Sequence, residues 1–154
     1  MTTPVIIRLC ELILNDVLSV VRNSLPDTAG VVSLSPVVDV TESATVSILP
    51  LSVTLDAFDR RTYAQNASVL IELTGYVGTS EINAYSPYFE AVENILNSLP
   101  FVVYVIDENI FKPLSAKVVT TPAVAYVDGG DANAYGFKAS ISFDLRRFLR
   151  YSND

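Results

Sequence analysis

A long alternation of apolar and polar residues between Tyr63 and Val77 constrains the fold of this chain most. The odd positions in this stretch are mostly apolar, and the polar residues concentrate at the even positions. A period of two residues is typical of a β-strand that buries one face. A shorter alternation precedes it from Val53 to Phe58, and the Asp59-Arg60-Arg61 break between the two predicts the corner of a hairpin.

A helix is predicted soon after this hairpin. Ser86 can cap its first turn, and Pro87 suits the first helical position. Four apolar residues then recur at spacings of three and four, which places them on one helix face: Phe89, Val92, Leu96 and Leu99. The hairpin and this helix together indicate an antiparallel sheet that is covered by a helix.

The N-terminal segment predicts a second main helix, from Thr3-Pro4 to about Leu25. Its polar residues form a narrow stripe, so the helix is apolar over more than half of its circumference, and such a helix is buried on several sides. Either a second subunit or a loop of the same chain can cover the extra face. Leu12 and Val17 on this helix are therefore candidate interface residues.

The remaining segments are expected to be mostly extended. Residues 31–40 are broken by a proline, residues 44–49 form a strand that Pro50 ends, and residues 101–106 form a strand buried on both faces. Residues 107–121, which contain Pro113, show little periodicity and are interpreted as a loop. Residues 123–127 form a strand before a turn at 128–131. The clean alternation from Tyr135 to Arg146 predicts a final strand, after which the tail frays.

These elements predict one domain of the α/β (α+β) class over residues 1–154, with a mixed, mostly antiparallel sheet covered by two main helices. The helix spans about 3–25, the sheet-and-helix core about 37–106, the loop or hairpin about 107–134, and the final strand about 135–146.

Composition limits the classes of function. The net charge is −7, with only ten Lys and Arg residues, so the chain lacks the clustered cations of a tight DNA binder. The lone Cys10 excludes an intrachain disulfide and fits a reducing compartment. No targeting segment or membrane span is expected. Half of the residues are hydrophobic, which fits either surface reserved for other subunits or a well-filled core.

The residues required for catalysis are scarce. The chain has no His, which is the commonest general base and transition-metal ligand, and it has no glycine-rich phosphate loop or nucleophile elbow. Two carboxylate pairs, Asp56 with Asp59 and Asp107 with Glu108, could hold Mg²⁺ in a small hydrolase, although solvated turn residues are the commoner role. A weak calcium site at Asp128 and Asp131 is similarly less favoured than a plain turn. We therefore expect no enzyme activity, no cofactor and no metal.

Tyrosines are numerous and suit protein interfaces, because the ring can pack while the hydroxyl stays in water. Tyr126 and Tyr135 flank the late turn and are candidate interface residues, with ordinary sheet residues as the equal alternative. Arg60 and Arg61, adjacent cations in a chain that has few, are further candidates, together with Asp56 and Asp59 beside them. At a hairpin corner they can contact a neighbouring subunit or another protein, and solvated turn residues are the alternative.

The order of these parts resembles a known family. The runs that carry the resemblance are VVDVTESATVSILPLSVTLDAFDRRTYAQNASVLIELTG, with its V-x-I-x-P segment at Val46 to Pro50, then the helix YFEAVENILNSL and the final strand GFKASISFDLRRF. Together they resemble the small tail-terminator, or tail-completion, proteins of long-tailed bacteriophages, the lambda-type neck family. The resemblance covers residues 37–148.

The resemblance implies a structural protein of the virion neck that is assembled in the host cytoplasm. It implies a hexameric ring that caps the tail tube protein, ends its polymerisation and offers a surface to the head-completion or connector protein. DNA passes through the ring without specific binding, and no membrane is involved. The long segment 107–134 departs from a minimal terminator. It leaves room for another neck, connector or tail-tube role, and the residues alone also leave open a small hydrolase or a monomeric ligand-binding domain.

Overall fold

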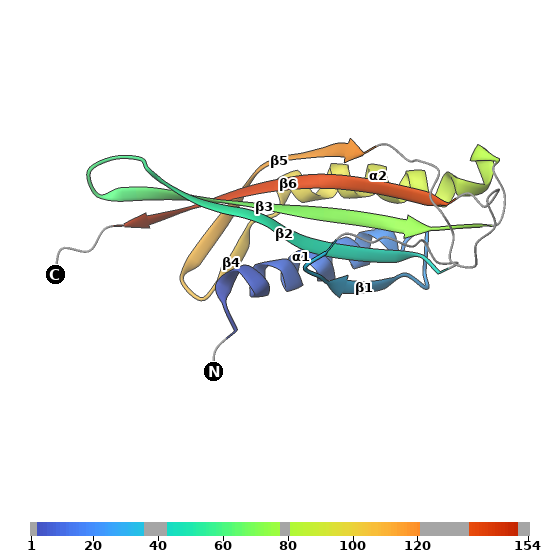
Figure 1. Ribbon diagram of the computed structural model, residues 1–154, viewed down its shortest axis with the longest axis horizontal. Coiled ribbons are helices and arrows are strands. Elements are labelled where there is room, and N and C mark those ends of the chain that lie inside the picture. The colour runs from blue at the N-terminus through green and yellow to red at the C-terminus, as the bar shows by residue number, and fades with distance from the viewer. Residues whose placement is uncertain (1–2, 36–42, 78–80, 121–135, 151–154) are drawn as a thin grey trace.

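The computed structural model describes residues 3–35, 43–77, 81–120 and 136–150, in which two helices cover one face of a sheet (Figure 1). The elements along the chain are α1 (Val5–Val21), β1 (Ala29–Val32), β2 (Thr45–Ala57), β3 (Thr62–Gly75), a 3-10 turn η1 (Ile82–Tyr85), α2 (Ser86–Ser98), a 3-10 turn η2 (Leu99–Phe101), β4 (Tyr104–Ile106), β5 (Asn109–Thr120) and β6 (Phe137–Arg150).

The six strands form a mixed sheet in the order β1-β2-β3-β6-β5-β4. Only β1 and β2 run parallel, and the other neighbours are antiparallel. β5 pairs with β4 through its first residues and with β6 beyond them. The expected α+β class, with a mostly antiparallel sheet and two covering helices, is confirmed.

The core lies between the helices and the odd-numbered face of β3, as the alternation predicts. Val69, Ile71 and Leu73 on this face are buried against residues from α1, α2 and β6. The largest fully buried side chains, which mark the centre of the core, are Phe111, Phe143, Leu9, Ile13, Ile48, Ile71, Leu73, Ile95, Leu99, Ile106, Ile141 and Leu145. On the opposite face of β3, Glu72 is only 2% exposed and is paired with Ser47 of β2 and Ser140 of β6. Part of this face is therefore shielded from solvent.

The sheet extends well beyond the helices at one end. β3 has 14 residues, which at about 3.3 Å each span about 45 Å, whereas the 17 residues of α1 span only about 25 Å. The excess forms a projection built from 51–57 of β2, 62–66 of β3 and 146–150 of β6, which we call the arm (Figure 1). Every residue of β2 from Leu51 to Ala57 is exposed.

Several sequence-based predictions are wrong in detail. Pro50 does not end a strand, because β2 continues through it with a bulge between Pro50 and Ser52. The proline is tolerated there because β1 pairs with β2 only as far as Ile48, so Pro50 lies on an edge of the sheet. Residues 109–120 are a strand rather than a loop. Pro113 lies where the pairing of β5 with β6 shifts register, beyond the residues of β5 that pair with β4. The register shift interrupts the alternation of apolar and polar residues that identifies strands.

The segment 101–106 is also different from its prediction. Only Tyr104–Ile106 is a strand, and it lies at the sheet edge, so Phe101 and Val105 are exposed rather than buried on both faces. Ser86 lies inside α2 with Tyr85 at the cap, and its hydroxyl donates back to the carbonyl oxygen of Asn83. The tail does not fray at Arg147, since β6 stays paired with β3 as far as Arg150.

A close contact between strand and helix provides the first testable prediction. A Cβ added at Gly75, near the end of β3, would lie 2.1 Å from the Tyr88 hydroxyl oxygen and 2.7 Å from ring carbons of Tyr88. Gly75→Ala should lower the free energy of unfolding by about 1–3 kcal/mol, because the buried ring must shift. At Gly30 of β1 the nearest atoms are the flexible ends of Leu14 and Leu18, so Gly30→Ala should cost less.

Urea unfolding of both variants measures the difference. Equal losses for the two glycine substitutions would contradict the contact between Gly75 and Tyr88.

Candidate interaction surface

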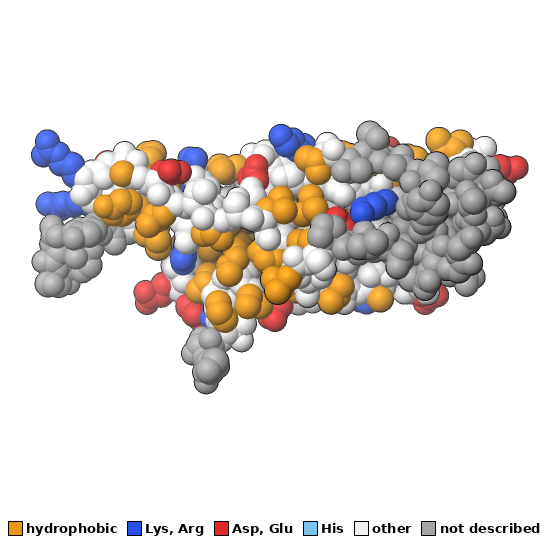
Figure 2. Space-filling view, viewed as in Figure 1, with side chains coloured by type: hydrophobic (Ala, Val, Ile, Leu, Met, Phe, Trp, Pro, Cys, Tyr) orange, Lys and Arg blue, Asp and Glu red, His pale blue; other side chains and the backbone are white. Residues whose placement is uncertain are grey.

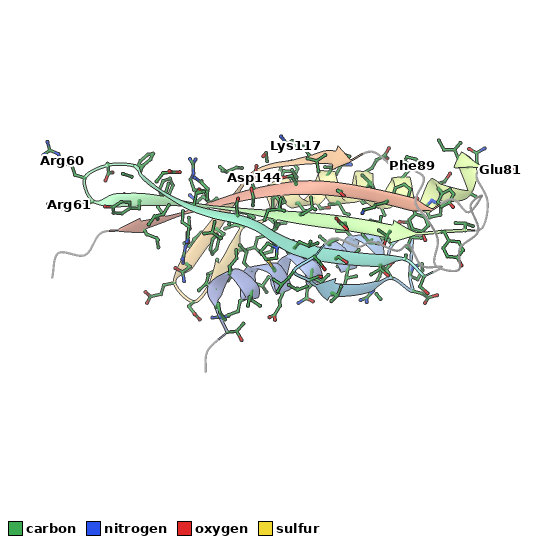
Figure 3. All side chains as sticks on the ribbon, viewed as in Figure 1. Arg60, Arg61, Glu81, Phe89, Lys117 and Asp144 are labelled. Carbon is green, nitrogen blue, oxygen red and sulfur yellow. The ribbon has the colours of Figure 1, made fainter. Side chains whose placement is uncertain are left out.

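The tip of the arm carries the two arginines that the sequence identifies. The corner closes through backbone bonds from the amides of Phe58 and Asp59 to the carbonyl oxygen of Thr62, at 2.9 and 3.1 Å. The Asp59 carboxylate accepts a hydrogen bond of 2.8 Å from the backbone amide of Arg61, as short polar side chains do in turns. Arg60 and Arg61 are exposed at the free end of the molecule, far from both helices (Figure 3).

Polar side chains hold the arm together on the sheet face away from the helices. Asn66 donates to the Asp56 carboxylate at 3.2 Å, and Arg146 Nε donates to the Asn66 amide oxygen at 2.7 Å. Asp56 and Asp59 therefore bond to separate groups, one along the strands and one in the corner. Their contacts favour a structural role in the arm over a shared metal site.

A second polar row links the base of the arm to β5. Asp144 accepts hydrogen bonds from the hydroxyls of Ser68 on β3 and Ser115 on β5, the latter at 3.2 Å. The sequence analysis did not identify Asp144, because its partners lie 76 and 29 residues away along the chain. Only the strand register brings the three residues together.

Arg147 fixes the other face of the arm. It donates to the side-chain oxygens of Gln65 and Asn109, and its guanidinium lies over the ring of Phe111, 5.1 Å from the centroid. Burial lowers the pKa of Arg147 from its usual value. Sequence reasoning missed this residue, because it placed Arg147 in a fraying tail. The arm is thus braced on both faces, and its tip stands in a defined position.

Apolar side chains are exposed along the arm. Val53 and Leu55 lie on β2, and Phe58 at the corner packs edge-on against Phe148 of β6 with ring centroids 5.1 Å apart; all four are exposed. Figure 2 shows hydrophobic side chains on the arm and over the middle of the molecule, with cations at the end of the arm. Within the described ranges, no strand pairs with the outer edge of β2 beyond Ile48. Such an edge is suited to protein contact.

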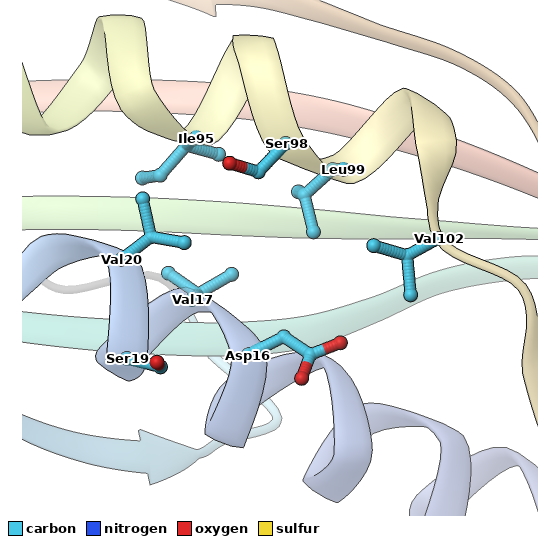
Figure 4. A pocket seen from close by; sticks show the side chains of 8 residues that line it. All are labelled: Asp16, Val17, Ser19, Val20, Ile95, Ser98, Leu99 and Val102. Atoms are coloured by element: carbon cyan, nitrogen blue, oxygen red, sulfur yellow. The ribbon is translucent and has the colours of Figure 1, made fainter.

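A groove of about 330 Å³ lies between α1 and α2 (Figure 4). Its lining is mostly apolar, with one carboxylate and two hydroxyls, and consists of Asp16, Val17, Ser19, Val20, Ile95, Ser98, Leu99 and Val102. Val17 and Val20 point from α1 toward α2 in this view. The groove therefore combines an apolar surface with a single negative charge.

Asp16 is partly buried in this groove. The buried Tyr104 hydroxyl lies close enough for Asp16 to influence it: burial raises the pKa of Tyr104, and the carboxylate raises it further. Among the described residues, no group is in hydrogen-bond geometry with the Tyr104 hydroxyl, and no cation forms an ion pair with Asp16. The sequence contains one indication of this site, since Asp16 is a charge outside the polar stripe of its helix.

The remaining candidate residues lie apart from one another. Val17 is only 1% exposed and belongs to the core as well as to the groove, whereas Leu12 is 37% exposed on α1. Asp107 follows β4 with a positive φ of 56° and pairs with Arg8 of α1, and Glu108 beside it is exposed. Tyr126, Tyr135, Asp128 and Asp131 lie outside the described residues, as does the expected strand at 123–127.

The described part of the chain contains no cluster of residues suited to hold a metal ion and no helix long and apolar enough to cross a membrane. Comparison with known proteins adds no relative. Neither the protein-family models nor the sequences of curated proteins give a match to this chain.

The ion pair between α1 and the β4–β5 turn makes the second prediction. Arg8 Nη1 lies 2.8 Å from Asp107 Oδ2, and the hydrogen bond from Arg8 holds the pKa of Asp107 below its usual value. A depressed carboxylate pKa contributes stability above the pKa of the unfolded chain, and this contribution disappears as the pH falls through the folded pKa. Arg8→Ala should raise the Asp107 pKa toward its ordinary value, as measured by NMR titration.

Arg22→Ala is the control, because Arg22 bonds to the carbonyl oxygen of Thr28 instead. An Asp107 pKa that is the same with and without Arg8 would show that the pair does not persist in solution.

Proposed function

We propose that this chain is a structural protein that assembles into a ring at the end of a phage tail tube, where it stops tube growth and joins the head connector. One observation carries the proposal: the braced arm presents a strand edge with which no described strand pairs, exposed apolar side chains and two tip arginines. A surface of this kind suits contact with another protein. The phage context rests on the resemblance of residues 37–148 to tail-terminator proteins.

The chemistry of the described residues supports a structural role. The carboxylates that a hydrolase would need are engaged separately, Asp56 by Asn66, Asp59 by the corner backbone and Asp107 by Arg8. A net charge of −7 fits a ring through which DNA slides without being held, because an acidic surface repels phosphates. The proposed partners are further copies of the chain, the tail tube protein and a connector protein.

The direct experiment measures both assembly and capping. Sedimentation of the purified chain over a range of concentrations should give a closed oligomer, with a hexamer as the expected mass. Added to polymerising tail tube protein, the chain should shorten the tubes and lie at one end of each in electron micrographs. A chain that stays monomeric at every concentration, alone and with tube protein, would contradict the proposal.

Leu12 makes the third prediction. Its side chain is exposed on α1, so Leu12→Asp should leave the folded monomer intact while weakening assembly about tenfold or more, if α1 faces another subunit. Val17→Asp places a charge in the core and should instead unfold the chain. Circular dichroism follows the fold, and sedimentation follows the mass. If the Leu12→Asp variant assembles as the wild type does, this part of α1 does not lie in the interface between subunits.

A further inference from the structure

We propose that the arm tip of one copy docks in the groove between α1 and α2 of the next copy, with an arginine of the tip beside Asp16 and Phe58 on the apolar lining. This inference rests on the proposed ring assembly and deepens it, because it names the two surfaces that meet. It describes a head-to-tail contact, which repeats around a ring when the rotation closes.

The two surfaces match in charge. Arg60 and Arg61 stand at the end of the arm, whereas Asp16 is a half-buried carboxylate with no ion pair to any described cation. A guanidinium suits this position, because its planar fork can bind a carboxylate through two parallel hydrogen bonds. The positive tip of the arm and the negative groove are therefore complementary surfaces of the same chain.

The two surfaces also match in apolar character. Phe58 is exposed beside the tip arginines and is held in place by Phe148. Val20 and Val102 are partly exposed apolar side chains of the groove, beside the buried Val17 and Leu99. The groove volume of about 330 Å³ lies at the lower end of the range for ligand pockets. Aromatic and arginine side chains that enter such a pocket are the usual anchors of protein interfaces.

The tip of the arm cannot reach the groove between α1 and α2 of its own chain. The paired residues beyond the bulge, 52–57 of β2 with 63–68 of β3, extend the hairpin by about 20 Å, and this extension leads away from both helices (Figure 1). The hydrogen bonds of Arg146 and Arg147 to Asn66 and Gln65 oppose its folding back. A tip that is rigid and distant from its own groove can reach the same groove only on another copy.

A charge-reversal cycle is the fourth prediction and the test. Asp16→Lys alone, and Arg60→Glu with Arg61→Glu, should each raise the midpoint concentration of assembly by about tenfold or more, because like charges then meet. The three changes combined should restore assembly to within about threefold of wild type. Single reversals that assemble normally, or a combined variant no better than either, would overturn the docking.

Matched controls separate this contact from a general charge effect. Glu11→Lys changes the same charge on α1, about 140° around the helix from Asp16, and Glu11 is exposed. Lys117→Glu reverses an exposed cation on β5, on the sheet face away from the helices. Both control variants should assemble as wild type does, and losses equal to those of the test variants would overturn the docking.

Cysteine crosslinking tests the contact in case Asp16→Lys fails to fold. Arg60→Cys combined with Ser98→Cys should form interchain disulfides on oxidation and give a ladder of multimers, because Ser98 lines the groove. Arg60→Cys with Ser115→Cys, which places the thiol on β5, should give none, and the native Cys10 is buried in both variants. A ladder in neither pair, or in both, would overturn the docking.

The outcomes distinguish this inference from the proposed function. If the wild type never assembles and never caps tubes, both fail. If rings form and cap tubes while the charge cycle and the crosslinks are negative, only the docking fails. If reversal at Arg60 and Arg61 abolishes capping but leaves the ring mass unchanged, the tip contacts tube protein, and the docking between copies is again overturned.

Discussion

The continuous pairing of β3 is the constraint on which the rest of the structure depends. β3 pairs with β6 along its whole length from Thr62 to Gly75, and with β2 from Tyr63 to Thr74. A strand rises about twice as fast per residue as a helix, so α1 and α2 can cover only part of a sheet built on it. The uncovered length becomes the arm. The helix-covered body and the projecting arm therefore follow from the same strand.

An arm without helical cover needs its own means of staying ordered, and this chain uses side chains on both faces. Arg146 and Asp56 meet at Asn66 on one face, and Arg147 bonds to Gln65 and stacks on Phe111 on the other. Hydrogen bonds to charged groups contribute about 1.5–3 kcal/mol each, more than neutral ones. The ordering of the tip thus depends on arginines near the end of β6.

Local sequence patterns predicted the parts of this structure that repeat regularly. The alternation of Tyr63 to Val77 identified β3, and the helical spacing identified α1 and α2. Patterns failed at Pro50 and Pro113, where bulges shift the register and break the alternation. The site followed the same rule. The tip arginines were found because a hairpin corner is a local feature, whereas Arg147 and Asp16 gain their roles only from segments distant in the sequence.

In the proposed docking, Asp16 is the residue whose charge is balanced only when two copies meet. Its carboxylate is partly buried in a groove lined mostly by apolar side chains, where burial of a charge carries a solvation cost, and no described cation forms an ion pair with it. An incoming guanidinium would compensate that cost only when two copies meet. The pairing would then favour the assembled state over the free subunit.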